Sequence, residues 1–218
     1  MSDIFREVDE EVRREQLKQL WERYGIYVIA LAVLIVAGVG GYRGWEYWQA
    51  KQAAEAGAKF DAAIELAEAD GKSAEAQAAF AKIAAEGTPG YRVLARLQEA
   101  AELGKSDAKA AVTAYDAVAA DTSVAKPLRD LATIRAAILL VDTAPLAEMS
   151  GRLEALATPD GAFRHTAREL LALAAYRAND ATALKRWLDA IAGDAEAPQT
   201  LRVRMEALRA LTGDAAKG

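Results

Sequence analysis

The sequence predicts an all-α protein in which a single transmembrane helix is followed by an α-solenoid of paired helices. Alanine, the strongest helix former, makes up about a quarter of the 218 residues. Val, Ile and Thr, which favour strands, are sparse outside residues 26–39. One long apolar stretch lies near the N-terminus, and Gly, Pro, Asn and Asp divide the rest into short apolar-periodic segments.

The composition excludes two classes of function. The chain is 53% hydrophobic and 27% charged, as in folded proteins. A net charge of −5 and a pI near 5.1 argue against non-specific nucleic-acid binding, which needs a basic surface. Cysteine is absent, so disulfides and thiol chemistry are excluded.

A transmembrane helix is predicted over residues 24–44. No charge occurs between Arg23 and Arg43, and this stretch as a helix is about 28 Å long, close to the ~30 Å hydrocarbon core. Backbone amides in lipid must bond within the segment, so it must be helical. Aromatic residues at both ends are typical of membrane interfaces. These interface belts are Trp21, Tyr24 and Tyr27 at one end and Tyr42, Trp45, Tyr47 and Trp48 at the other.

Two other interpretations of this segment are less suitable. A buried core helix seldom has aromatic residues at both ends. A cleaved signal peptide needs a short basic start and a small-residue cleavage site, whereas residues 1–23 hold seven acidic and five basic side chains. We therefore expect the segment to stay attached.

The distribution of charge predicts the orientation of the membrane segment, and its small residues predict a face for helix association. Five basic residues precede the segment and three follow it within a similar distance, which favours a cytoplasmic N-terminus and an exported C-terminal domain. Gly40 and Gly44, with Ala37 and Gly41, form small-residue pairs four apart, a candidate face for helix association.

Residues 1–23 are predicted to form a cytoplasmic amphipathic arm. Its apolar residues, mostly four apart, fall on one helical face opposite the charged residues. Such a helix can lie on the inner membrane surface, or it can dock on a cytosolic partner. The apolar residues are Ile4, Phe5, Val8, Val12, Leu17, Leu20 and Trp21.

Residues 45–213 are predicted to form a helical-repeat domain, followed by a tail over residues 214–218. Helix breaks are expected near Gly71, 87–90, 104–106, 121–127, 143–145, 158–161, 179–180 and 193–198, which leaves segments of about 12–18 residues. A spacing of small, aromatic and apolar residues at i, i+4 and i+7 recurs at intervals of 35 and 72 residues. Its members, the predicted repeat-packing residues, are Ala76, Phe80, Ile83, then Ala111, Tyr115, Val118, then Ala183, Trp187, Ala190.

A unit near 34–36 residues with helix–turn–helix form indicates a divergent tetratricopeptide-like solenoid of about four units, with a final helix near 198–212. In the third unit Gly151 falls at the aromatic position. That unit is therefore either degenerate or shifted, for example to Met149, Leu153 and Leu156. A plain antiparallel helical bundle is the alternative fold.

No catalytic residue, cofactor site, metal site or small-molecule site is predicted. The single histidine, His165, lacks companion ligands and is expected to be a partly exposed helix residue. No nucleophile elbow, phosphate loop or dinucleotide fingerprint occurs. Acidic pairs such as Glu99 and Glu102 are expected on solvated helix faces.

The order of these parts resembles the YfgM-like family of bacterial proteins. The likeness lies in the arm FREVDEEVRREQLKQLWERYG, the span that ends in Gly44-Trp45-x-Tyr47-Trp48, and the divergent helical repeats. The resemblance implies an ancillary subunit of the Sec translocon in the inner membrane, with its N-terminus cytoplasmic and its C-terminal domain periplasmic. It also implies protein partners: translocon subunits and a membrane-anchored periplasmic chaperone.

The leading functional hypothesis is therefore a non-enzymatic, membrane-tethered interaction protein that helps this chaperone receive newly exported proteins. The alternative is a cytosol-facing docking module for a membrane assembly or signalling complex. A membrane-bound hydrolase is a third hypothesis, which requires a cleft with convergent polar groups. The residues that bind the partner are not identified by the sequence.

Overall fold

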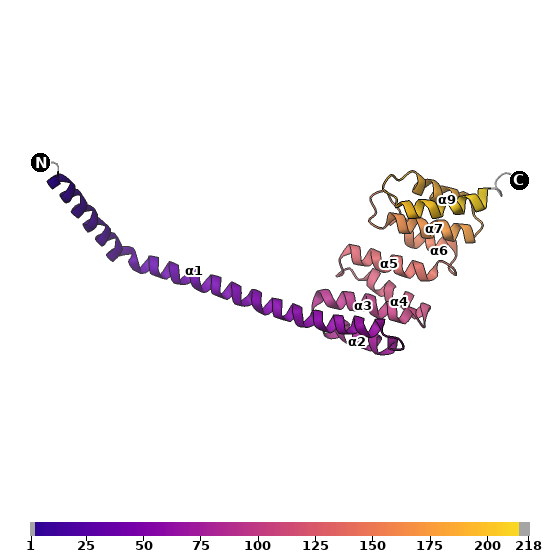
Figure 1. Cartoon of the computed structure of the whole chain (residues 1–218), viewed down its shortest axis with the longest axis horizontal. Coiled ribbons are helices and arrows are strands. Elements are labelled where there is room, and N and C mark those ends of the chain that lie inside the picture. The colour runs from indigo at the N-terminus through magenta and orange to yellow at the C-terminus, as the bar shows by residue number, and fades with distance from the viewer. Residues whose placement is uncertain (1–2, 214–218) are drawn as a thin grey trace. The chain divides into compact units, whose positions relative to one another are not determined.

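The computed structural model describes residues 3–213, with side chains described from Arg13 to Thr212 except Gln16. The all-α prediction is confirmed: nine helices and no strand occur in this range (Figure 1). The expected tail, residues 214–218, lies outside it. The helices are α1 (Asp3–Glu68), α2 (Ser73–Glu86), α3 (Pro89–Gly104), α4 (Ala108–Ala120), α5 (Lys126–Leu140), α6 (Leu146–Leu153), α7 (Arg164–Arg177), α8 (Ala181–Ala192) and α9 (Gln199–Gly213).

The chain divides into two compact units, residues 1–55 and residues 56–218. In the first unit α1 runs without a break through the expected arm and the expected membrane segment. It is the one helix of the described residues that is long and apolar enough to cross a membrane. The apolar side chains of residues 24–44 are exposed, unlike those of a core helix in a soluble domain.

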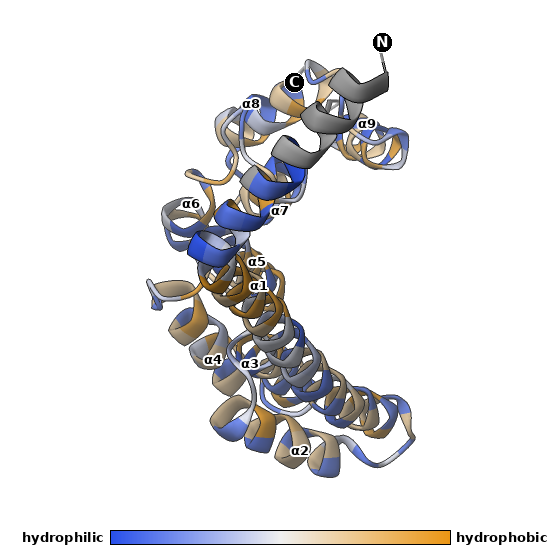
Figure 2. Ribbon diagram, turned by 90° about the vertical axis from the view of Figure 1, so that its left-hand side faces the viewer, coloured by the Kyte–Doolittle hydropathy of each residue, from blue (hydrophilic) through white to orange (hydrophobic). Residues whose placement is uncertain are grey.

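The second unit is built from consecutive antiparallel helices in two layers. In Figure 2, α4, α6 and α8 follow one another along the left side of the unit, and α3, α5, α7 and α9 lie to their right. We call the layer of α3, α5, α7 and α9 the inner layer; within it α5 contacts α7, and α7 contacts α9. This alternation is the arrangement of an α-solenoid, in which each helix pair packs on its neighbours.

Three hydrophobic clusters follow one another along this unit. The first joins the end of α1 to α2 and α3 around Phe80, the second joins α3, α4 and α5 around Tyr115, and the third joins α5 to α9 around Leu171. Phe60 of α1 contacts Phe80 and Tyr91, with ring centroids 5.6 and 5.5 Å apart. The C-terminal part of α1 is thereby a member of the repeat domain.

Local sequence explains where these helices begin and turn. The side chains of Asp107 and Asp180 cap α4 and α8, each accepting a bond of 2.9 Å from the backbone N–H three residues later. Pro89 and Pro127 lie in the first turn of α3 and α5, where no backbone N–H is needed. Asn179 has a positive φ of 55° in the tight turn between α7 and α8. Every predicted break overlaps a connection between two helices, although 87–90 and 104–106 extend into α3 and 121–127 extends into α5. Helix α6, with 8 residues, is shorter than predicted.

Candidate functional site: the helical-repeat surface

The even-numbered helices bury the residues of the recurring pattern. In α2 and α4 all six are buried, and Phe80 and Tyr115 are 0% and 3% exposed. In α8 Trp187 is 5% exposed, while Ala183 and Ala190 are partly buried against the same cluster. The outer face of Trp187 is covered by the guanidinium of Arg186, 4.3 Å from the ring centroid.

The third repeat is shifted. Met149, Leu153 and Leu156 of the α6 region are buried, whereas Ala147 and Gly151, which keep the regular interval, are exposed. The loops on either side of α5, residues 121–125 and 141–145, are longer than the two-residue connection between α2 and α3. The additional loop residues displace the packing position from Gly151 to Leu153.

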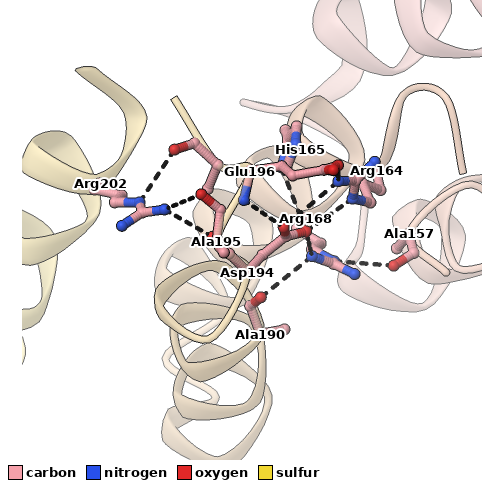
Figure 3. A network of polar contacts seen from close by, with 10 residues as sticks. Ala157, Arg164, His165, Arg168, Ala190, Asp194, Ala195, Glu196 and Arg202 are labelled. Atoms are coloured by element: carbon pink, nitrogen blue, oxygen red, sulfur yellow. Dashed lines mark hydrogen bonds and ion pairs between the residues drawn. The ribbon is translucent and has the colours of Figure 1, made fainter. Parts of the chain in front are cut away.

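A network of charged side chains joins α7 to the connection between α8 and α9 (Figure 3). Asp194 accepts bonds of 2.7 Å from Nε of Arg164 and from Nη1 of Arg168. Arg168, which is buried, also donates to the carbonyl oxygens of Ala157 (2.9 Å) and Ala190 (3.2 Å). The bond from Arg164 is the main reason why the pKa of Asp194 is held far below its usual range.

Arg202 of α9 completes this connection. Its guanidinium donates to the carbonyl oxygens of Asp194 (2.9 Å), Ala195 (2.7 Å) and Ala197 (3.1 Å), which lie in the loop between the two helices. The network therefore fixes the loop that positions α9. Its geometry is that of a structural clamp.

His165 lies at the edge of this network without a ligand set around it. Its side chain is 21% exposed, and its buried Nδ1 atom has no hydrogen-bond partner and lies 3.8 Å from Oδ2 of Asp194. Among the residues from Arg13 to Thr212, no group of three or more His, Asp or Glu side chains is arranged to hold a metal ion.

Glu102 does not lie on a solvated face as expected, because it is buried at the junction of α1, α2 and α3. It accepts a bond of 2.7 Å from the hydroxyl of Ser73 and forms an ion pair of 2.7 Å with Lys105. Lys105 also donates to the carbonyl oxygen of Ala67 (3.1 Å). Partial burial raises the pKa of the neighbouring Glu99.

An apolar groove of about 390 Å³ lies on the inner layer between α3 and α5. Ile138 and Leu139 of α5 face the small residues of α3, and Tyr115 of α4 closes the floor. Sequence reasoning missed this groove, because a gap between two helices a repeat apart has no local pattern. The lining residues are Ala100, Ala101, Gly104, Lys105, Tyr115, Arg135, Ile138 and Leu139.

In the first unit, the predicted interface residues project from α1 into open space. Trp21, Tyr24 and Tyr27 are 60%, 49% and 70% exposed, and the second belt is exposed to the same degree. The second belt consists of Tyr42, Trp45, Tyr47 and Trp48.

The predicted association face is open as well. Apart from the backbone of the helix itself and the adjacent residues, no atom lies within 4 Å of where a Cβ would be at Gly40, Gly41 or Gly44, and Ala37 borders a shallow apolar groove with Ile29. On the arm, Leu17 and Leu20 are exposed. The side chains of Ile4, Phe5, Val8 and Val12 lie outside the described residues.

Comparison with known proteins identifies the family of the chain. Residues 18–210 match a tetratricopeptide repeat-like domain. No curated protein and no solved structure matches the chain. Domains of this class bind other proteins, which agrees with a repeat surface that carries a groove. The match covers most of the chain, and the protein therefore belongs to the tetratricopeptide repeat-like family.

Proposed function

We propose that the protein is a non-enzymatic, membrane-tethered interaction protein of the bacterial inner membrane. In this proposal it is an ancillary subunit of the Sec translocon and helps a membrane-anchored periplasmic chaperone receive newly exported proteins. One observation carries the proposal: a single unbroken helix, α1, contains both the exposed apolar segment and the first packing residues of a protein-binding repeat domain.

The extent of the family match supports a retained anchor. The match begins at residue 18 and so includes the apolar segment together with the repeats. A removable leader is not needed for the packing of the domain it precedes, whereas α1 contributes Phe60 and Ala63 to the first cluster. The aromatic belts and the charge bias support an exported domain.

The groups that could support catalysis act instead in packing and in structural ion pairs. Glu102 is paired with Lys105 and Asp194 with two arginines, and among the described residues His165 belongs to no group of side chains arranged to hold a metal ion. A hydrolase would need convergent polar groups in a cleft, whereas the groove between α3 and α5 is mainly apolar.

Site-directed photocrosslinking in membranes tests the partner. A photoreactive amino acid at Ile138, in the groove of the inner layer, should capture a newly exported chain, a translocon subunit or the periplasmic chaperone. The same group at Lys185 on α8, whose side chain is 78% exposed outside the groove, is the matched control. Adducts with cytosolic proteins alone would contradict the proposal.

Fusion reporters test the topology. An exported C-terminal domain gives active alkaline phosphatase and little fluorescence from a cytosol-dependent fluorescent protein at the same junction. The reverse pattern would place the repeats in the cytosol and support a docking module for a cytosolic assembly.

A further inference from the structure

We propose that the groove between α3 and α5 binds an extended segment of a partner polypeptide in which a branched apolar side chain is adjacent to an aspartate or glutamate. The inference deepens the proposed function and rests on it for the partner being a newly exported chain. The chemistry of the groove itself supports this choice of segment.

The apolar half of the segment follows from the shape of the groove. Ala100, Ala101 and Gly104 leave space on α3 opposite Ile138, whose side chain is 49% exposed. The volume of about 390 Å³ lies in the range of roughly 300–1,000 Å³ found for ligand sites. A branched apolar side chain placed there covers the exposed side chain of Ile138, which removes apolar surface from water.

The acidic half follows from the two cations that line the groove. Lys105 is already engaged by Glu102 at 2.7 Å and by a carbonyl oxygen of α1. Arg135, among the described side chains, takes part in no ion pair and no hydrogen bond, whereas Lys126 on the same helix is paired with Asp130. A guanidinium with free donors beside apolar surface is suited to a carboxylate, which it can bind through two parallel bonds.

An extended segment, rather than a chain end, fits the surface beyond the groove. Ala101, Ile138, Tyr176 and Leu211 each lie twelve residues after the first residue of α3, α5, α7 and α9, respectively. Because these helices run in the same direction, the four residues lie at the same end of the inner layer. Tyr176 and Leu211 are 45% and 75% exposed, so exposed side chains with apolar surface occur at this end of α7 and α9 as well, where an extended partner chain could reach them.

Fluorescence anisotropy with the purified full-length protein in detergent tests the inference. The probe is a labelled, flexible nine-residue peptide with a central Leu-Glu pair, and the comparison peptides carry Leu-Gln, Leu-Lys or Ser-Glu. We expect the Leu-Glu peptide to bind most tightly. Arg135→Gln should weaken its binding roughly three- to tenfold, which is the effect of losing a partly exposed hydrogen bond between charged groups. The affinity for the Leu-Gln peptide should not change.

Matched variants separate this contact from general effects. Arg92→Gln removes an exposed arginine of α3 outside the groove lining and should not change affinity. Arg135→Glu should reverse the preference toward the Leu-Lys peptide. Ile138→Asp and Ala101→Phe should weaken both leucine peptides, with circular dichroism confirming that each variant is folded.

Three results would overturn the inference. These are equal affinity for the Leu-Glu and Leu-Gln peptides, an equal effect of the substitutions at Arg135 and Arg92, and self-association that Ile138→Asp abolishes, which would assign the groove to a second copy of this chain. The assay does not depend on topology. Peptide binding together with a cytosolic reporter result would reject the proposed function alone, and an exported domain that fails to select the Leu-Glu peptide would reject this inference alone.

Discussion

At the scale of single residues, Asp194 connects more parts of the repeat domain than any local pattern around it suggests. Its carboxylate binds two arginines of α7, while its backbone carbonyl accepts from Arg202 of α9. Such charge-assisted bonds are short and directional, and their loss leaves the buried guanidinium of Arg168 with fewer partners.

We expect Asp194→Asn to lower the thermal stability of the protein at neutral pH. The folded-state pKa of Asp194 lies below the value of about 3.9 for an unfolded chain, so its contribution is complete above pH ~5 and is lost as the pH falls further. The difference in melting temperature between wild type and variant should therefore hold down to about pH 5 and narrow steadily as the pH falls toward about 2. Circular dichroism melts check this, with Glu196→Gln, an exposed partner of Arg164, as the control.

A constant difference in melting temperature across this pH range would show that the Asp194 carboxylate does not stabilise the fold through its charge. The same result for Glu196→Gln and Asp194→Asn would show that no single carboxylate of the network dominates.

Asn179 gives a second prediction at this scale, since it holds a left-handed conformation in the turn between α7 and α8. Asn179→Val should destabilise the domain by about 1–2 kcal/mol, because a branched Cβ clashes with the backbone at positive φ. Asn179→Gly should have little effect. Chemical denaturation measures both, and equal stability of the two variants would contradict the structural assignment of this turn.

At the scale of elements, α6 is the helix in which the structure departs from the repeat pattern of the sequence. Leu153 takes the buried position, and Gly151 faces open space, with no side chain from elsewhere in the chain within 4 Å of the position that a Cβ would occupy. A buried leucine contributes to the core, whereas a glycine within an exposed helix surface costs backbone entropy without a packing benefit.

Substitutions at Leu153 and Gly151 of α6 should therefore change the stability of the domain in opposite directions. Leu153→Ala should destabilise the domain by about 2–5 kcal/mol, and Gly151→Ala should stabilise it by about 0.5–1 kcal/mol. Denaturant unfolding followed by circular dichroism measures the two free energies. If Gly151→Ala proved the more damaging change, the unshifted pattern would be the correct one.

The elements differ in how well they can be predicted from the sequence. The apolar segment, the helix breaks and the burial of Phe80 and Tyr115 follow from composition and periodicity over a few turns. The position of Leu153 depends on the lengths of two loops, which periodicity within α6 does not encode. The pairing of Arg164 with Asp194 and of Ser73 with Glu102 joins residues about thirty apart, and many exposed charges in this sequence could form such pairs equally well.

At the scale of the whole molecule, the repeat domain has unequal clusters rather than one core. The cluster from α5 to α9 contains 21 buried residues, the middle one contains 8, and the one that joins α1 to α3 contains 5. In solenoids stability is close to a sum of local and nearest-neighbour contributions, so the clusters need not open together.

Hydrogen exchange of the full-length protein should reveal this gradient. Amides of α7 should exchange most slowly, those of α4 at an intermediate rate, and those of α2 fastest among the buried helices, because opening an end needs fewer contacts to break. Mass spectrometry of peptic fragments measures the order. Uniform protection across α2, α4 and α7 would instead indicate that the domain opens as one cooperative unit.

The three successive clusters also affect how the domain acquires its structure. Each is formed by a nearly continuous stretch of chain, 60–95, 97–136 and 134–208, so no cluster waits for a distant segment to arrive. A polypeptide that emerges N-terminus first can therefore consolidate one cluster while the next is still within a ribosome or a channel. Helices released early find their neighbours at once, which limits the time that apolar side chains remain uncovered during synthesis.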